Sequence, residues 1–361
     1  MGKKLIVLFL TLVVFVGISG GYVVGGLQAY FRYQHTLSCG GQSPVHICVP
    51  QLSQTPILSA FYPSYVRHAS LFAIGYSSDN PKTLVISVNI TNFSQVQTQT
   101  VNATATQQSV SFTPPIKSPT VLLNLTADES TFLHVQVTDL QGHRFYENDS
   151  PLVLLSRWKM QWQASTLSQI AAWVTPDDPA IGSLVTKAAA HLPQETPPAP
   201  DAMIGYNGGN ATPQEVKDQV DAIFDALRLD YHMSYVQEDI QYGGPRDTKP
   251  ATQLVKLPTE VLQQHSGMCV ELTVLLASAV ERIGLHAELI IIPDHMFLGV
   301  AITPDNKQFE YWDTVLVNKG DAGESANILT DNTYAQNKKQ NTIVDTILIS
   351  EARNAGIGPM I

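Results

Sequence analysis

Three residues in the second half of the chain have the types and the order of a cysteine-based catalytic triad. Cys269 is followed by His295 and then by Asp313. A thiol becomes an effective nucleophile when an imidazole accepts its proton, and a carboxylate beside the imidazole fixes its tautomer and stabilises the imidazolium. The trio therefore predicts a nucleophile, a general base and an orienting carboxylate. The alternative is a buried structural cysteine with a solvated histidine in a turn.

The residues around Cys269 predict that it stands at the start of a helix. Gly267 allows a tight entry, and Gly284 marks the end of the pattern. Between them runs an apolar stripe at steps of three and four, formed by Leu272, Leu275, Leu276, Ala279, Val280 and Ile283. A thiol at a helix N-terminus faces unpaired backbone N–H groups and the positive end of the helix dipole, which together favour the thiolate.

The other two triad candidates follow predicted strands. Residues 286–292 form an apolar run that ends in a Pro-Asp turn, and His295 comes directly after this turn. Strands are also predicted over residues 296–302 and 308–312, and Asp313 ends the last of them. If these strands pair antiparallel, His295 and Asp313 lie close together while the helix packs its N-terminus against the same sheet.

The remaining two cysteines predict a disulfide. Cys39 and Cys48 are nine positions apart, and in an oxidising compartment a bond between them would stabilise the fold by roughly 2 to 3 kcal/mol. Cys269 is then a free thiol. Unpaired thiols are one alternative, and a loose metal cluster with His35 and His46 is another, although the spacing fits no usual zinc pattern. We expect neither a metal nor an organic cofactor.

The N-terminus predicts a membrane signal-anchor over residues 1–27. Lys3 and Lys4 precede an uncharged apolar run over residues 5–27, which at about 1.5 Å per residue is long enough to span a bilayer core of about 30 Å. Basic residues before the run place the rest of the chain outside the cytoplasm. A cleaved signal peptide is the alternative, with a small-x-small site at residues 17–19. Both interpretations make the bulk of the chain extracytoplasmic.

Length and texture divide the rest of the chain. A chain of 361 residues suits two domains, and its net charge of −10 argues against a nucleic-acid partner. Residues 28–65 are predicted to be a tether. Short strands separated by turns predict an immunoglobulin-like β-sandwich over residues 66–163, including a strand over residues 120–125. Helical periodicity, clearest over residues 213–228, then indicates an α+β domain over residues 164–361.

The segments around the trio resemble a known family. The motif residues are Pro258, Glu260 and Leu262, then Cys269, Leu275, Ala277 and Ser278, then Gly284 and Leu285, then Pro293 and His295, and finally Trp312, Asp313 and Thr314. In these residues the chain is similar to the transglutaminase-like superfamily of papain-type cysteine enzymes, over roughly residues 165–361. Met268 and Met296 depart from the residues usual beside the cysteine and the histidine, which bears on substrate preference.

The resemblance implies cysteine-dependent acyl transfer on amide bonds. Cys269 would be the nucleophile, His295 the general base and acid, and Asp313 the orienting residue, with no cofactor. Water as the acceptor makes a peptidase or amidase, and an amine makes a cross-linking enzyme. We expect a protein or cell-wall peptide as substrate, and an oxyanion site formed by the Cys269 N–H with Gln241. The competing hypothesis is a non-catalytic module on the same fold that binds a partner at the cell surface.

Overall fold

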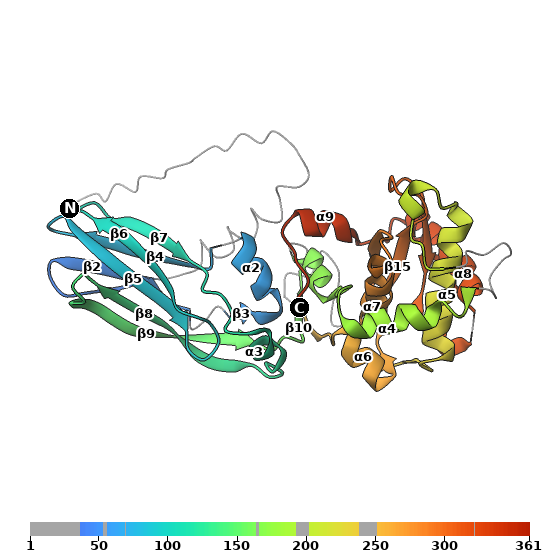
Figure 1. Ribbon diagram of the computed structural model, residues 1–361, viewed down its shortest axis with the longest axis horizontal. Helices are drawn as coiled ribbons and strands as arrows, with labels where there is room; N and C mark the ends of the chain where they lie inside the picture. The colour runs from blue at the N-terminus through green and yellow to red at the C-terminus, as the bar shows by residue number, and fades with distance from the viewer. Residues whose placement is uncertain are drawn as a thin grey trace, which may run out of the picture.

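The computed structural model describes residues 37–52, 56–68, 70–163, 166–192, 202–237, 251–320 and 322–361. Strands dominate the first part of the chain, and helices around a second sheet form the other part, beside it (Figure 1). The chain is thus a mixed α+β protein, as the periodicities predicted.

Two facing sheets form the first part. One has the order β1-β2-β4-β7 and the other the order β3-β9-β8-β5-β6. The first sheet comprises β1 (Leu37–Gly40), β2 (Val45–Pro50), β4 (Phe72–Ser78) and β7 (Gln108–Phe112). The second comprises β3 (Ile57–Leu58), β9 (Arg144–Leu155), β8 (Glu129–Thr138), β5 (Lys82–Ile90) and β6 (Gln97–Ala103). Alternate residues of β5 and β8 are buried, because each strand turns one face to the core between the sheets.

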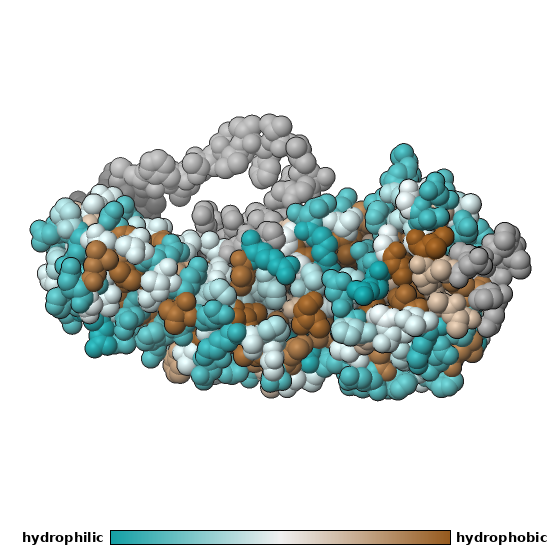
Figure 2. Space-filling view, viewed as in Figure 1, coloured by the Kyte–Doolittle hydropathy of each residue, from teal (hydrophilic) through white to brown (hydrophobic). Residues whose placement is uncertain are grey.

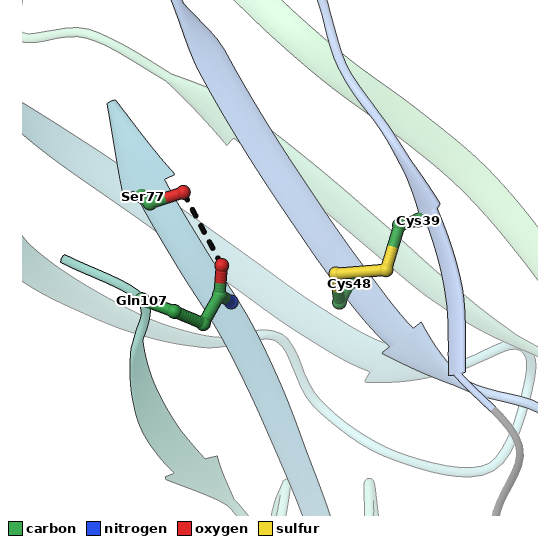
Figure 3. Close-up of a disulfide and its surroundings, with 4 residues drawn as sticks. All are labelled: Cys39, Cys48, Ser77 and Gln107. Atoms are coloured by element: carbon green, nitrogen blue, oxygen red, sulfur yellow. Dashed lines mark hydrogen bonds between the residues drawn. A yellow bond between two sulfur atoms is a disulfide. The ribbon is translucent and has the colours of Figure 1, made fainter. Parts of the chain in front are cut away.

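Much of the predicted tether belongs to this sandwich. Residues 37–50 form its β1 and β2, and residues 57–68 form β3, a 3₁₀ turn η1 (Ser59–Phe61) and α2 (Tyr62–His68). A disulfide joins Cys39 to Cys48, which lie directly opposite each other on β1 and β2 (Figure 3). The periodicity of this stretch is weak because all four residues of β1 are exposed, so pairing and the disulfide hold that strand in place.

The strand expected over residues 120–125 is also corrected. These residues mostly belong to a short helix, α3 (Pro119–Leu123). Its first residue is a proline, whose fixed φ suits the start of a helix and whose missing N–H costs nothing there. The β-branched and leucine residues after it favoured a strand, but local backbone geometry at the proline outweighs that preference.

The predicted fold class included a transmembrane helix, and this part needs correction. Across the described residues, no helix is both long and apolar enough to cross a membrane. The longest of these helices is α8 (Gly323–Gln340), and it carries acidic, amide and lysine side chains along its length. Residues 1–27, where the span was predicted, lie outside the described residues.

A second antiparallel sheet with the order β16-β15-β14-β17 is the centre of the other part. Its strands are β14 (Ala287–Ile292), β15 (His295–Ala301), β16 (Phe309–Trp312) and β17 (Asp345–Leu348). The helix predicted at the cysteine is confirmed as α7 (Cys269–Arg282), which packs against β14 and β15. α8 packs along β16, where Tyr334 stacks on Tyr311 with ring centroids 3.8 Å apart.

Further helices belong to this part. α4 (Pro179–Ala188), α5 (Pro213–Leu229) and α6 (Pro258–Gln264) pack against α7, and η2 (Leu167–Trp173) packs against α9 (Ile349–Asn354). α5 confirms the helix predicted over residues 213–228 and begins with a capping box. The Thr212 hydroxyl accepts a hydrogen bond from the Glu215 N–H at 3.2 Å, and the Glu215 carboxylate accepts one from the Thr212 N–H at 2.7 Å.

An ion pair joins the two parts. Arg157, which follows β9, donates two hydrogen bonds to the Glu260 carboxylate on α6, at 2.9 and 2.8 Å. Trp158 Nε1 and the Leu257 N–H also donate to this carboxylate. Burial alone would raise the pKa of Glu260, but the hydrogen bonds from Arg157 and Leu257 and the Arg157 charge lower it below its ordinary value.

The chain crosses between the parts through a short ladder. β10 (Lys159–Trp162) follows β9 closely and pairs antiparallel with β12 (Ala251–Leu254) of the second part. β10, which was predicted to belong to the first domain, thus pairs with a strand from the segment predicted as the second domain. Hydrophilic residues predominate on the face seen in Figure 2, and apolar residues form small separate patches there.

We predict that Arg157→Met lowers the free energy of unfolding by about 3 kcal/mol, because it leaves the Glu260 carboxylate largely buried without its cation. Urea unfolding followed by circular dichroism measures this loss. Arg282→Met is the matched control, since Arg282 pairs with Asp177 at the surface and its loss should change little. Equal effects of the two substitutions would contradict the anchoring role of Arg157.

Candidate active site

Cys269 is the first residue of α7, and the backbone around it is fixed on both sides. Glu271 Oε2 accepts a hydrogen bond from the Met268 N–H at 3.1 Å, and Glu271 Oε1 accepts one from the Lys256 N–H at 2.9 Å. The Gly267 carbonyl accepts one from the Val236 N–H at 2.9 Å. These bonds hold Cys269 at a helix start, where backbone N–H groups lack partners within the helix.

Close packing explains the glycine before the cysteine. A Cβ atom at Gly267 would lie 3.1 Å from Val261 Cγ1 and 3.3 Å from the Glu271 side chain. Gly267 belongs to β13 (Ser266–Gly267), which pairs parallel with β11 (Ser234–Tyr235). A larger residue there would crowd Val261 on α6 and Glu271 on α7.

The sheet brings the other two candidates together. His295 is the first residue of β15 and lies opposite Ile292, across a two-residue hairpin. Asp313 directly follows β16, whose Trp312 lies opposite Leu298. His295 Nε2 and Asp313 Oδ2 are 2.7 Å apart. The other carboxylate oxygen, Asp313 Oδ1, accepts a hydrogen bond from the Val315 N–H at 3.0 Å and so caps η5 (Thr314–Lys319).

Cys269 is a second neighbour of His295 and, like Asp313, acts to raise the pKa of its imidazole. Burial of the ring lowers the pKa of His295, but the hydrogen bonds and charges of Asp313 and Cys269 outweigh it and raise the pKa to about 10. The imidazole is therefore protonated at neutral pH. A protonated imidazole beside a sulfur stabilises negative charge on that sulfur, as nucleophilic cysteines require.

Tyr235 is a further neighbour of this trio. Burial raises the pKa of its phenol, and negative charge at Cys269 and Asp313 raises it further. The exposed fraction of the cysteine is small: Cys269 is 2% exposed, whereas the side chains of His295 and Asp313 are 20% and 17% exposed. Neighbouring side chains therefore cover Cys269 almost completely.

A small pocket adjoins His295. Its lining is mostly apolar and comprises Trp162, Gln253, Val270, Ile291, Ile292, Asp294, His295 and Met296. Gln253 Oε1 accepts a hydrogen bond from Trp162 Nε1 at 2.8 Å, and Gln253 Nε2 donates to the Met268 sulfur at 2.7 Å. A thioether is a weak acceptor, so the Gln253 amide keeps donor capacity for a stronger one.

Gln253 was not predicted from the sequence. It lies on a four-residue strand, β12, whose buried and exposed residues alternate. Its relation to the cysteine arises from the pairing of β12 with β10, which no local pattern encodes. Gln241, the predicted oxyanion donor, lies outside the described residues.

In the structure, the described residues of the metal alternative have other partners. Cys39 and Cys48 are bonded to each other, and His46 Nε2 lies 3.4 Å from Asp79 Oδ1. His35 lies outside the described residues. Within the described ranges, no group of three or more His, Cys, Asp or Glu side chains could hold a metal ion.

No known protein family and no curated protein matches this chain. The resemblance to the transglutaminase-like superfamily therefore stays a prediction carried by the motif residues.

The raised pKa of His295 predicts a pH-dependent contribution to stability. Because the folded value of about 10 exceeds the ordinary value of 6.5, the contribution is complete below pH 6.5 and is lost as the pH rises through about 10. The difference in free energy of unfolding between the wild type and His295→Gln should shrink over that range. Urea titrations at several pH values measure it.

Asp313→Ala is the control for this prediction. Without the carboxylate, the imidazole loses its main opposite charge, so a further His295→Gln substitution should show much less pH dependence. In the wild-type background, the difference in free energy of unfolding caused by His295→Gln should change with pH. A difference that stays constant from pH 6 to pH 10 would contradict a charged His295 paired with Asp313.

Proposed function

We propose that this chain catalyses cysteine-dependent acyl transfer on amide bonds, as a transglutaminase-like peptidase or amidase. The observation that carries the proposal is the Asp313–His295 pair beside Cys269, with the cysteine at the first position of a buried helix. A structural cysteine needs neither a histidine partner nor a carboxylate behind that histidine.

The proposed reaction proceeds through a thioester. The Cys269 sulfur forms a bond to the amide carbonyl carbon, and the carbonyl oxygen takes up negative charge. His295 donates its proton to the leaving amine as the C–N bond breaks, which leaves an acyl group on the sulfur. His295 then accepts a proton from water, whose oxygen attacks the thioester, and the C–S bond breaks to release the carboxylic acid and restore the thiolate beside the protonated imidazole.

Two donors support this mechanism at the charged oxygen. The Cys269 backbone N–H lies at the helix start, and the Gln253 amide lies in the adjoining pocket. Donors placed before the reaction stabilise charge that develops during it. We therefore assign to Gln253 the role first expected of Gln241.

Hydrolysis is preferred over cross-linking because water needs no second binding site. An amine in the place of water would give an amide between two substrates by the same steps. The proposed substrate is a protein or cell-wall peptide outside the cytoplasm, and the Cys39–Cys48 disulfide supports that location, since such bonds persist in oxidising compartments.

A second candidate function is a non-catalytic binding module, and the burial of Cys269 favours it. Only 2% of this residue is exposed, which suits a structural cysteine. The two functions differ in whether His295 changes the ionisation of the sulfur, which chemical labelling measures without a known substrate.

We predict that Cys269 keeps its reactivity toward iodoacetamide at acid pH. A free thiol loses about tenfold of its reactivity per pH unit below its ordinary pKa of about 8.5. The ratio of the alkylation rates at pH 6 and pH 9 should be near one in the wild type and should fall steeply in His295→Ala. This ratio cancels the slow access to a buried sulfur, and Cys269→Ser gives the background.

Identical ratios in the wild type and in His295→Ala, both equal to that of a free thiol, would refute the catalytic proposal. They would leave the binding module as the better account.

We further predict that the wild type cleaves amide bonds in a mixture of surface-protein and cell-wall peptides, whereas Cys269→Ala does not. Mass spectrometry detects new termini that carry the mass of one added water.

Gln253→Leu should lower kcat by about 10²- to 10³-fold. The same variant should keep the alkylation ratio of the wild type, because alkylation develops no oxyanion. A Gln253→Leu variant with full activity would remove Gln253 from the mechanism.

A further inference from the structure

The strand that carries Asp313 to the site is an edge strand. β16 ends its sheet and pairs there with β15 alone. An edge strand leaves a row of backbone N–H and C=O groups without strand partners, and these groups usually face water or another chain. In this chain α8 lies along that edge.

Three side chains of α8 bind the free edge of β16. Asp331 Oδ1 accepts a hydrogen bond from the Tyr311 N–H at 3.0 Å, and Asn327 Nδ2 donates one to the Tyr311 carbonyl at 3.1 Å. Thr330 Oγ1 accepts one from the Asp313 N–H at 2.9 Å. The three residues are spaced i, i+3 and i+4, which puts them on one face of the helix, and they supply the bonds that a neighbouring strand would supply.

The Thr330 hydroxyl is oriented for this contact. It donates its own hydrogen to the Ala326 carbonyl at 2.7 Å, so an oxygen lone pair is left for the Asp313 N–H. Thr330 and Asn327 are each 1% exposed, and water does not compete at either bond.

These bonds determine where the Asp313 carboxylate lies. Its backbone N–H is held by Thr330, and its Oδ1 is held by the Val315 N–H. The preceding residue is anchored as well, since Trp312 Nε1 donates to Asp221 Oδ1 at 2.6 Å. The remaining oxygen, Oδ2, is thereby directed at His295. A shift of about 1 Å at such a group is enough to weaken a catalytic arrangement.

We propose that Thr330 is a positioning residue of the triad and that Asn327 and Asp331 complete a substitute strand edge that fixes Asp313 against His295. The proposal rests on the proposed function only in calling the trio catalytic; the coupling of Thr330 to the ionisation of His295 is independent of it.

Thr333 offers a matched control on the same helix. Its Oγ1 donates to the Leu329 carbonyl at 3.1 Å at the protein surface, as Thr330 Oγ1 does to Ala326 in the interior. Thr333→Val therefore removes the same bond within the helix without touching β16. Thr330→Ser keeps the hydroxyl and should rescue the contact.

The test is the titration of His295, followed by NMR in full-length protein labelled with ¹⁵N-histidine. The charged groups that face the ring are Asp313 and Cys269, with Asp294 at the adjoining pocket and Tyr235 near the first two. Thr330→Val should lower the His295 pKa by about one unit or more, because a displaced carboxylate loses much of an effect of about 1 to 3 units. Thr330→Ser and Thr333→Val should match the wild type, and Asp313→Ala sets the largest change.

The alkylation ratio of Cys269 at pH 6 and pH 9 is the second measurement. It should fall in Thr330→Val and stay unchanged in Thr333→Val. A His295 titration in Thr330→Val equal to that of the wild type overturns the proposal. An equal shift in Thr333→Val also overturns it, since the effect would then come from general loosening of α8.

If Thr330→Val does not fold, Asn327→Ala tests whether α8 positions Asp313. It removes the bond to the Tyr311 carbonyl and a contact with Glu310 but leaves Thr330 in place. A smaller decrease of the His295 pKa is therefore expected, and an unchanged titration overturns the proposal. These outcomes differ from failure of the proposed function. A wild-type sulfur without enhanced reactivity refutes the enzyme, whereas the His295 titration still reports whether α8 positions Asp313.

Discussion

A protonated imidazole held largely out of water is the interaction on which the rest of the structure depends. His295 keeps its charge in a mostly buried site because the Asp313 carboxylate lies 2.7 Å from one ring nitrogen and Cys269 also acts to raise the pKa of the ring. Desolvation opposes that charge, so small errors in the position of either partner would cost the ring its proton. The sheet fixes the position of Asp313, and the start of α7 fixes the position of Cys269.

Contacts far from the Cys269 sulfur hold this arrangement in place. Two of the motif residues, Glu260 and Ser278, make such contacts. Glu260 receives Arg157 from the end of the sandwich, and α6, which carries it, leads directly to β13 and the cysteine. Ser278, about two and a half turns after Cys269 along α7, accepts a hydrogen bond from the Thr175 N–H at 2.9 Å in the interior. Both residues hold α7 in place and neither contacts the reacting atoms. The motif therefore includes both the proposed catalytic residues and residues that support their positions.

Much of the site could be predicted from the sequence because its elements have strong periodic patterns. The apolar stripe of α7 and the apolar run of β14 predicted a helix and a strand, and their order placed Cys269, His295 and Asp313 correctly at element ends. Gln253 could not be predicted because its position depends on a four-residue ladder between distant segments. The role of α8 could not be predicted for another reason. Its buried residues include the polar Asn327 and Thr330, while Ile328 and Leu329 are exposed, so it has no apolar stripe that a hydrophobic pattern could reveal.

The burial of Cys269 also bears on how long the thiol survives. In the oxidising compartment proposed for this chain, peroxides and small disulfides convert exposed thiolates to sulfenic acids or mixed disulfides. Those reagents have to touch the sulfur, and only 2% of the residue is exposed. A peptide that inserts a side chain beside His295 can move the cover aside with its own binding energy, which a small oxidant cannot do. If Cys269 is the proposed nucleophile, the cover over its sulfur would thus protect it from small oxidants in that compartment.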